Sequence, residues 1–243
     1  ANKQYNYTAK ETLNIMQRLY ENHKVLTYPR TDSRYLSQDI VPTIKERLKA
    51  CSVGPYRKIA GTLINRPLAE QVVNNKKVTD HHAIIPTEQF VQLDHMTVDE
   101  RRIYDLVVRR FLAVLYPPCE YEQTEVTVRI GSERFTARAN VVTQTGWKTA
   151  YEGQSGSWEE DESTEAAESS ADSQKLLSLK EGDVLKGVVL AMTEGKTKPP
   201  APFNEASLLS AMENPAAYME SKDKAMAKTL GETGGLGTVA TRA

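Results

Sequence analysis

The chain has 243 residues, of which 40% are hydrophobic and 26% are charged, and its formal net charge is −1. This composition allows a buried core and excludes a wholly disordered chain, while the length suits one large domain or two to three small ones. No apolar run approaches the roughly 18 residues of a membrane span, and two cysteines without C-x-x-C spacing exclude a disulfide framework, so a reducing cytoplasm is expected.

Capping boxes, in which a Thr hydroxyl and a Glu carboxylate three residues later satisfy free amides reciprocally, occur twice in the first half of the chain. They predict helices that begin after Thr8 and after Thr97, and a weaker helix is predicted over 39–50. Together these helices indicate a helical domain over residues 1–116. Their spacing predicts core positions at Leu13, Met16, Tyr20, Ile103, Val107, Phe111, Val114 and Leu115.

The period changes to two within residues 117–195, which predicts a β-rich domain. Alternating apolar residues on both sides of Gly131-Ser132 predict a hairpin with a type II′ turn, and residues 183–192 (DVLKGVVLAM) resemble a further strand. Between them, residues 152–172 hold eight acidic residues and no Lys or Arg, which predicts a mobile acidic loop.

The last part of the chain, residues 196–243, is expected to begin a further helical domain, with a helix from about Asn204 towards Pro215. Outside the acidic loop the chain carries 31 basic residues against 24 acidic ones. This mildly basic balance permits a nucleic-acid partner but is equally typical of an ordinary protein surface.

The stretch LTYPRTDSRYLS, residues 26–37, mixes groups that a hydrophobic core does not need. Tyr28 precedes Pro29, which disfavours helical backbone at the tyrosine and predicts an extended conformation. Because residues two apart in an extended chain point to the same side, Tyr28 and Arg30 are expected to face one space. An ordinary phenol is protonated at neutral pH, and a guanidinium beside it favours its anion and holds a phosphate in two places.

Three polar residues complete this stretch. Asp32, two positions beyond Arg30, is expected to orient the guanidinium, while Thr31 and Ser33 are candidates for phosphate contacts. The same residues also describe a turn that leads into a helix, with local hydrogen bonds from Asp and Ser side chains. Both interpretations remain open on local chemistry.

Two further stretches are candidates for chemistry. In TDHHAIIPT, residues 79–87, a histidine beside a phosphoryl-transfer centre binds phosphate or supplies the proton that the leaving oxygen needs. His81 and His82 are adjacent, which is poor spacing for a metal pair, and ordinary structural histidines are an alternative. In GETGGLGTVATRA, residues 231–243, glycines before a possible helix allow an anion site or form a simple linker.

Together the three stretches resemble the type IA DNA topoisomerases, whose nucleophilic tyrosine sits in a T-Y-x-R-T-D-S motif. Pro29 after the tyrosine and His82 in the second element are most similar to the bacterial topoisomerase III branch. The resemblance implies that Tyr28 is the nucleophile, that Arg30 positions it and the scissile phosphate, and that His81 is the catalytic-site histidine. The third element implies DNA-backbone contacts, at Thr238, Thr241 and Arg242.

The resemblance also implies a multidomain α+β fold, part of a toroidal enzyme, in which a helical domain carries the tyrosine and an antiparallel β domain forms an arch. Such enzymes bind Mg²⁺ through an N-terminal Toprim domain that nothing here resembles, and no D-x-D occurs. We therefore expect a piece of a longer, ATP-independent enzyme, and no metal site in the piece itself. The piece alone is expected to bind single-stranded DNA weakly and to cleave it poorly or not at all.

The implied partners are single-stranded DNA and negatively supercoiled or catenated duplex DNA, acted on by a monomer in the cytoplasm, at the nucleoid. A non-catalytic DNA-binding module, in which Tyr28 stacks on a base and Arg30 contacts phosphate, is the main alternative. A recombinase or rolling-circle nuclease is disfavoured, because neither a suitable arginine pattern nor a metal-binding histidine pair is present. A pure interaction protein is a remote third alternative.

Overall fold

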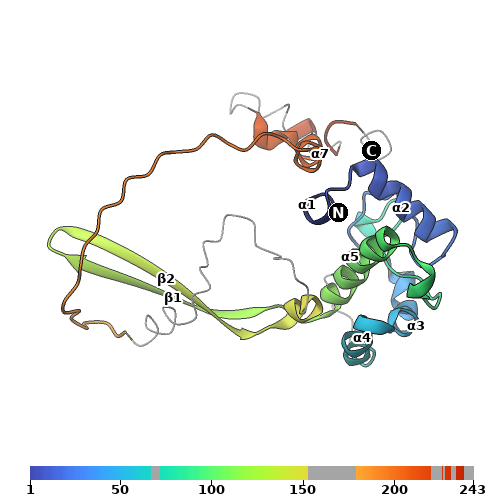
Figure 1. The fold of residues 1–243 in the computed structure, drawn as a ribbon, viewed down its shortest axis with the longest axis horizontal. Coiled ribbons are helices and arrows are strands. Elements are labelled where there is room, and N and C mark those ends of the chain that lie inside the picture. Colours follow the sequence, from blue (N-terminus) through green and yellow to red (C-terminus); the bar gives the residue numbers. More distant parts are fainter. Residues whose placement is uncertain (67–71, 153–178, 220–225, 227, 231–233, 238–243) are drawn as a thin grey trace. The chain divides into compact units, whose positions relative to one another are not determined.

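The computed structural model describes residues 1–66, 72–152, 179–219, 226, 228–230 and 234–237 (Figure 1). Helices together with one antiparallel hairpin confirm the predicted α+β class. The chain divides into two compact units: the first comprises Ala1–Pro117, Thr149–Glu152 and Ala201–Ala243, and the second comprises Pro118–Lys148 and Gly153–Pro200. No helix among the described residues has the length and apolarity needed to cross a membrane.

The first unit is helical. Its α-helices are α1 (Asn2–Tyr5), α2 (Ala9–Glu21), α3 (Ile44–Cys51), α4 (Arg57–Leu63), α5 (Val98–Leu115) and α7 (Glu205–Glu213). Short 3₁₀ turns connect them: η1 (Gln38–Thr43), η2 (Gly54–Tyr56), η4 (Asn75–Lys77), η5 (Leu93–His95) and η7 (Pro215–Tyr218), while η6 (Gly146–Tyr151) links the two units. The predicted helices that begin after Thr8, Thr97 and Asn204 are all confirmed, each with a side chain that caps the first turn.

The core of this unit forms where α2 packs on α5. Leu19 of α2 and Val108 and Leu112 of α5 are completely buried. The predicted face of α5 is largely confirmed, because three of its five core positions are buried and the other two are half-buried. The predicted face of α2 is confirmed only in part: Met16 is half-buried and packs against the core, but Ile15 and Leu19 are the buried residues, and Tyr20 is 37% exposed.

The segment predicted as one weak helix over 39–50 is two elements. Pro42 lies inside the 3₁₀ turn η1, and the α-helix α3 begins only at Ile44. A proline has no amide hydrogen and clashes with the preceding turn, which explains why regular α-helix starts after it. Helix α4 was not predicted.

The second unit contains the predicted hairpin. Strands β1 (Glu120–Ile130) and β2 (Glu133–Gln144) pair antiparallel, with Ile130 opposite Glu133. Gly131 has φ 63° whereas Ser132 has no positive φ, as a type II′ turn requires. The strands extend beyond the apolar alternation because the backbone ladder continues where the side chains are polar.

The further strand predicted over 183–192 is wrong. These residues form no β-ladder in the described part of the chain, and Val189 is 89% exposed. Gly187 has φ 71°, which interrupts an extended strand. The acidic loop 152–172 lies outside the described residues except for Glu152.

Candidate active site

Hydrogen bonds join the segment of residues 25–36 to the segment of residues 72–87. The Thr27 amide donates to the Ile85 carbonyl at 3.0 Å, and the Ile85 amide donates to the Thr27 hydroxyl at 3.0 Å. A backbone bond from Ala83 to the Tyr35 carbonyl, 2.9 Å long, adds a second attachment. The first two motifs of the sequence are therefore neighbours in space, although about 50 residues separate them.

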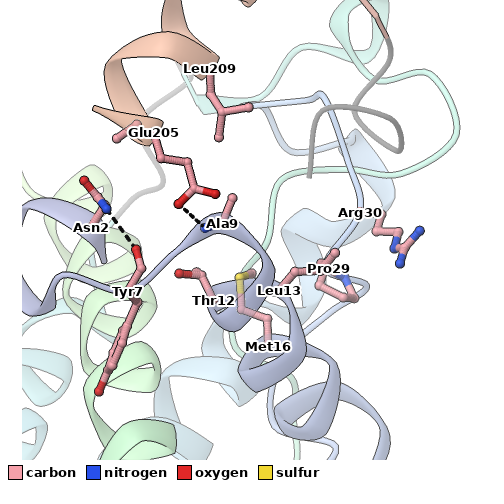
Figure 2. Close-up of a pocket in the computed structure, with 11 residues that line it drawn as sticks. Asn2, Tyr7, Ala9, Thr12, Leu13, Met16, Pro29, Arg30, Glu205 and Leu209 are labelled. Carbon is pink, nitrogen blue, oxygen red and sulfur yellow. Dashed lines mark hydrogen bonds between the residues drawn. The ribbon is translucent and has the colours of Figure 1, made fainter. Parts of the chain in front are cut away.

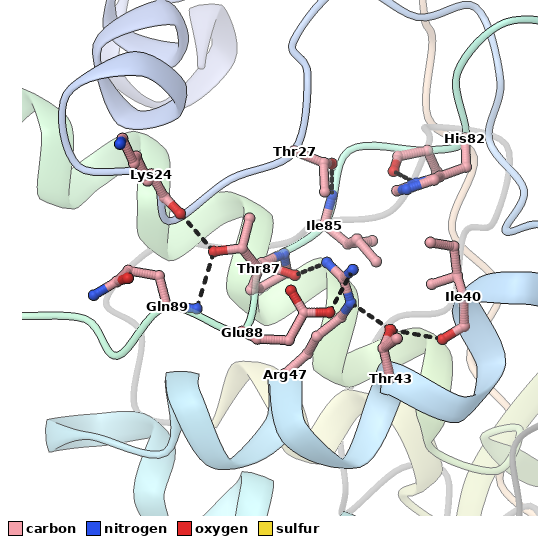
Figure 3. Close-up of polar contacts among 12 residues, drawn as sticks. Lys24, Thr27, Ile40, Thr43, Arg47, His82, Ile85, Thr87, Glu88 and Gln89 are labelled. Atoms are coloured by element: carbon pink, nitrogen blue, oxygen red, sulfur yellow. Dashed lines mark hydrogen bonds and ion pairs between the residues drawn. The ribbon is translucent and has the colours of Figure 1, made fainter.

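Arg47 of α3 holds the end of the second segment (Figure 3). This buried side chain donates to the Pro86 carbonyl at 2.8 Å and to the Thr43 hydroxyl at 2.8 Å, and it forms an ion pair with Glu88 at 2.8 Å. Burial lowers the pKa of the Arg47 guanidinium, and the neighbouring Glu88 carboxylate opposes that change. The segment that carries His81 is thus attached to the helical core.

Tyr28 is half-buried and has two aromatic neighbours. Its ring lies 4.5 Å from the His81 ring, centroid to centroid, with 42° between the planes. The Tyr20 ring contacts it edge-on at 5.5 Å and 81°. The Tyr28 hydroxyl makes no hydrogen bond with any residue that the structure describes, so its oxygen is left for an external group.

Arg30 is exposed and makes no hydrogen bond or ion pair within the described part of the chain. It lies at the rim of a cavity, and its guanidinium points away from the other labelled residues (Figure 2). The structure brings the His81 ring to Tyr28, whereas Arg30 forms no hydrogen bond or cation–ring contact with either of these two residues. A positioning role for Arg30 therefore stays a prediction.

The polar residues after Arg30 attach this loop to the second motif. The Thr31 hydroxyl donates to the His81 carbonyl at 2.8 Å, and the buried Ser33 hydroxyl donates to the Lys77 carbonyl at 2.8 Å. Asp32 accepts from the Thr79 hydroxyl at 3.3 Å, and within the described residues it forms no ion pair with Arg30, so its expected role in orienting the guanidinium stays a prediction. For Ser33, its burial and its bond to the Lys77 carbonyl favour the loop-closing alternative over a phosphate contact.

The remaining candidates do not join this group. His82 places its Nδ1 2.7 Å from the Ala83 carbonyl, so that ring nitrogen is used locally. Thr238, Thr241 and Arg242 lie outside the described residues. In the ranges that the structure describes, no group of three or more His, Cys, Asp and Glu side chains is placed to hold a metal ion.

A cavity of about 260 Å³ lies beside Arg30, between α2 and α7 (Figure 2). Leu13 and Met16 line it from α2, and Leu209 lines it from α7. The Glu205 carboxylate accepts from the Ala9 amide at 3.0 Å, where the first turn of α2 leaves an amide free. Helix α7 therefore contacts the start of the helix that carries Tyr20.

Helix α2 is also fixed at its other end. Glu100 accepts from the Arg18 guanidinium at 2.9 Å and from the Thr97 amide at 2.9 Å, and His23 lies 3.4 Å from the same carboxylate. Burial alone raises the pKa of Glu100, but the bonds from Thr97 and Arg18 outweigh it and lower the pKa to about 2. This carboxylate thus stays charged and ties α2 to α5.

Sequence reasoning missed the contacts of Tyr20 and Arg47 in this site. The sequence singled out Tyr20 only as a member of the apolar stripe of its helix. Its contact with Tyr28 spans a turn that no spacing rule describes. Arg47 gave no signal beyond ordinary helical charge.

Comparisons with known proteins agree on the kind of protein. A family model described as "DNA topoisomerase" matches residues 1–243. A DNA topoisomerase 3 of Bacillus cereus is 54% identical, and that of Bacillus subtilis (strain 168) is 51% identical. Both comparisons cover 100% of this chain but 33% of the relative, so the chain spans about a third of the length of these proteins.

A solved structure supports the fold alone. Full-length topoisomerase I from Thermotoga maritima matches with a TM-score of 0.60 and 23% sequence identity. The match covers 96% of this chain and 36% of that chain.

Proposed function

Because the chain belongs to the type IA DNA topoisomerase family and its curated relatives are topoisomerases III, we propose that it carries the tyrosine-bearing part of a DNA-cleaving enzyme. The whole enzyme cleaves one DNA strand through a 5′-phosphotyrosine, passes DNA through the gap and reseals the strand without ATP. The observation that carries this proposal is the contact between the Tyr28 and His81 rings, together with a Tyr28 hydroxyl that makes no hydrogen bond within the described residues. The chain spans about a third of the length of its relatives, and we propose that other parts of the whole protein complete the site.

In the proposed reaction the Tyr28 oxygen attacks a backbone phosphorus. As the bond from that oxygen to phosphorus forms, the phenol gives up its proton. The bond from phosphorus to the 3′-oxygen breaks, and the 3′-oxygen takes up a proton and leaves as a 3′-hydroxyl. The ring contact between Tyr28 and His81 supports His81 as the donor of that proton or as a phosphate ligand. The phosphodiester energy is kept as a phosphotyrosine ester, which explains why resealing needs no ATP.

Arg30 is proposed to bind the scissile phosphate. Its guanidinium is exposed and has no partner within the described part of the chain, which leaves its fork of donors available to a phosphate oxygen. Charge that develops on the phosphate is stabilised by such a positioned cation. Thr31 remains a candidate for a phosphate contact only if its bond to the His81 carbonyl opens.

The family uses Mg²⁺, but the described residues do not offer it a suitable donor set. Asp32, the carboxylate nearest Tyr28 in the sequence, is bonded to Thr79. We propose, from the family resemblance, that a Toprim domain of the whole protein holds the ion, and none of the steps above runs through it. The chain alone is proposed to bind single-stranded DNA weakly and to cleave it poorly or not at all.

For the whole protein we propose a toroidal monomer that acts at the nucleoid, in the cytoplasm, on negatively supercoiled or catenated duplex DNA with single-stranded regions. Residues 1–116 would form its tyrosine-bearing domain and 117–195 its arch, and 196–243 would begin the next DNA-binding domain. Thr238, Thr241 and Arg242 are proposed to contact the DNA backbone.

The test is plasmid relaxation by the full-length protein that carries this chain. Tyr28→Phe is expected to abolish relaxation of negatively supercoiled DNA while oligonucleotide affinity is preserved. Tyr121→Phe, which removes a hydroxyl from an exposed tyrosine of β1, is the matched control and should relax normally. Relaxation by the Tyr28 variant near the wild-type rate would remove this residue from the mechanism. Binding without relaxation by the wild-type protein would favour a DNA-binding module.

A further inference from the structure

We propose that Tyr20 is a positioning residue for the nucleophile: its ring sets the direction in which the Tyr28 hydroxyl points. The inference rests on the proposed function, because it assigns Tyr20 a role in the same reaction. Tyr20 lies in the helix before the motif and touches Tyr28 edge-on, with centroids 5.5 Å apart and planes at 81°. This geometry is a favoured one for an aromatic pair.

The Tyr28 side chain has no polar anchor within the described part of the chain. Its hydroxyl makes no hydrogen bond there, so packing against the ring decides where the oxygen points. The aromatic neighbours that provide this packing are His81, at 4.5 Å, and Tyr20. A nucleophile must be held close to its line of attack, and small errors in position cost much of the rate.

The His81 side of this arrangement is fixed through the backbone. The Thr31 hydroxyl donates to the His81 carbonyl at 2.8 Å, which joins the loop after Tyr28 to the residue that contacts its ring. Pro29 restricts the backbone directly after Tyr28. The remaining freedom of the Tyr28 ring is rotation about its side-chain bonds, which the Tyr20 contact limits.

Helix α2, which carries Tyr20, is anchored to the core by the residues next to Tyr20. Leu19, the preceding residue, is completely buried, and Arg18 is bonded to Glu100 of α5 at 2.9 Å. The hydroxyl of Tyr20 makes no hydrogen bond in the ranges that the structure describes. The contact is therefore made by the ring, and a phenylalanine in its place retains it.

The experiment uses the full-length protein, an end-labelled single-stranded oligonucleotide and Mg²⁺, with single-turnover cleavage measured after SDS. At saturating protein, Tyr20→Leu is expected to slow cleavage by about threefold to tenfold, the range of a lost edge-to-face ring contact. Oligonucleotide affinity should stay at the wild-type value, and the thermal midpoint should fall by no more than about 4 °C, because Tyr20 is already 37% exposed. Tyr20→Phe should restore the wild-type cleavage rate.

Phe90→Leu is the matched control, since it removes an aromatic ring that is 67% exposed outside the site, and it should cleave normally. A wild-type cleavage rate in Tyr20→Leu overturns the proposal. A lower oligonucleotide affinity with an unchanged cleavage rate at saturating protein also overturns it, because Tyr20 would then be a base-stacking residue. If Tyr20→Leu lowers the thermal midpoint by more than this, Tyr20→Met replaces it under the same criteria. Absence of cleavage by the wild-type protein refutes the proposed function instead, so the two failures are distinguishable.

Discussion

The carboxylate of Glu100 joins α2 to α5, and its replacement by glutamine gives a quantitative test of the scaffold. Gln keeps the shape of the capping box at Thr97 but loses the charge that Arg18 and His23 face. Hydrogen bonds lower the pKa of Glu100 from 4.5 to about 2 against the opposing effect of burial. A difference of this size corresponds to about 3 kcal/mol of stability at neutral pH.

The sign follows from the two pKa values. Because the pKa of Glu100 is lower in the folded chain, its contribution is complete above about pH 4.5 and is lost as the pH falls towards about 2. Urea unfolding of the 243-residue chain, followed by helical circular dichroism, should show Glu100→Gln about 2–3 kcal/mol less stable at pH 7. The difference should shrink steadily between pH 4.5 and 2.

Glu46→Gln is the control for this measurement. Glu46 pairs with Lys49 on the exposed side of α3, so its loss should change stability by no more than about 0.5 kcal/mol. Equal stability of wild type and Glu100→Gln at pH 7 would refute the reasoning. A gap between them that does not depend on pH would refute it as well, because the charge would then not be its cause.

Three further predictions follow from other contacts. Arg47→Met should lower the free energy of unfolding by about 2–4 kcal/mol, because it leaves the Pro86 carbonyl and Glu88 without their partner. Arg57→Met, on the exposed side of α4, should change the stability little, and equal effects of the two variants would contradict the role given to Arg47. Cys51 is fully buried, and burial raises its pKa to about 12. A thiol reagent should therefore modify Cys119 in the native chain and both cysteines only after unfolding, whereas rapid labelling of Cys51 in the native chain would contradict its burial. In the full-length protein, Arg30→Lys should slow cleavage by at least about tenfold, because a point charge cannot replace a bidentate fork, and a wild-type rate would refute the role given to Arg30.

Local signals in the sequence predicted the helices well. The capping boxes at Thr8 and Thr97 act within four residues, so their outcome does not depend on distant parts of the chain. The buried face of α2 depends on partners, and the helix has two: α5 covers Ile15 and Leu19, whereas Leu13 and Met16 face the cavity beside α7. Spacing alone cannot distinguish such faces.

The β prediction failed where a partner strand was needed. The hairpin was predictable because its turn residues, Gly131 and Ser132, specify the pairing of the strands beside them. Residues 183–192 have the apolar content of a strand, but no neighbouring strand pairs with them within the described residues. Strand propensity reflects packing on neighbours, so it cannot replace them.

The family was predictable from three short motifs, and the family model confirmed it. Tyr28 and His81 are neighbours because backbone hydrogen bonds pair two segments that are distant in the sequence. The chemistry of the individual residues does not predict this pairing. The expected link from Asp32 to Arg30 stays a prediction: Asp32 accepts from the Thr79 hydroxyl at 3.3 Å, and no ion pair joins it to Arg30 within the described residues. The contact of Tyr20 with Tyr28 spans a turn that no sequence spacing rule describes, so it could be identified only in the structure.

The most direct test of the central claim is a covalent adduct. The full-length protein is incubated with an end-labelled single-stranded oligonucleotide and Mg²⁺, stopped with SDS and run on a denaturing gel beside its Tyr28→Phe variant. We predict a labelled adduct, joined through a 5′-phosphate to Tyr28 in the peptide map and absent from the variant. A protein that binds the oligonucleotide but forms no adduct, or forms it equally without the Tyr28 hydroxyl, would contradict the assignment of Tyr28 as the nucleophile.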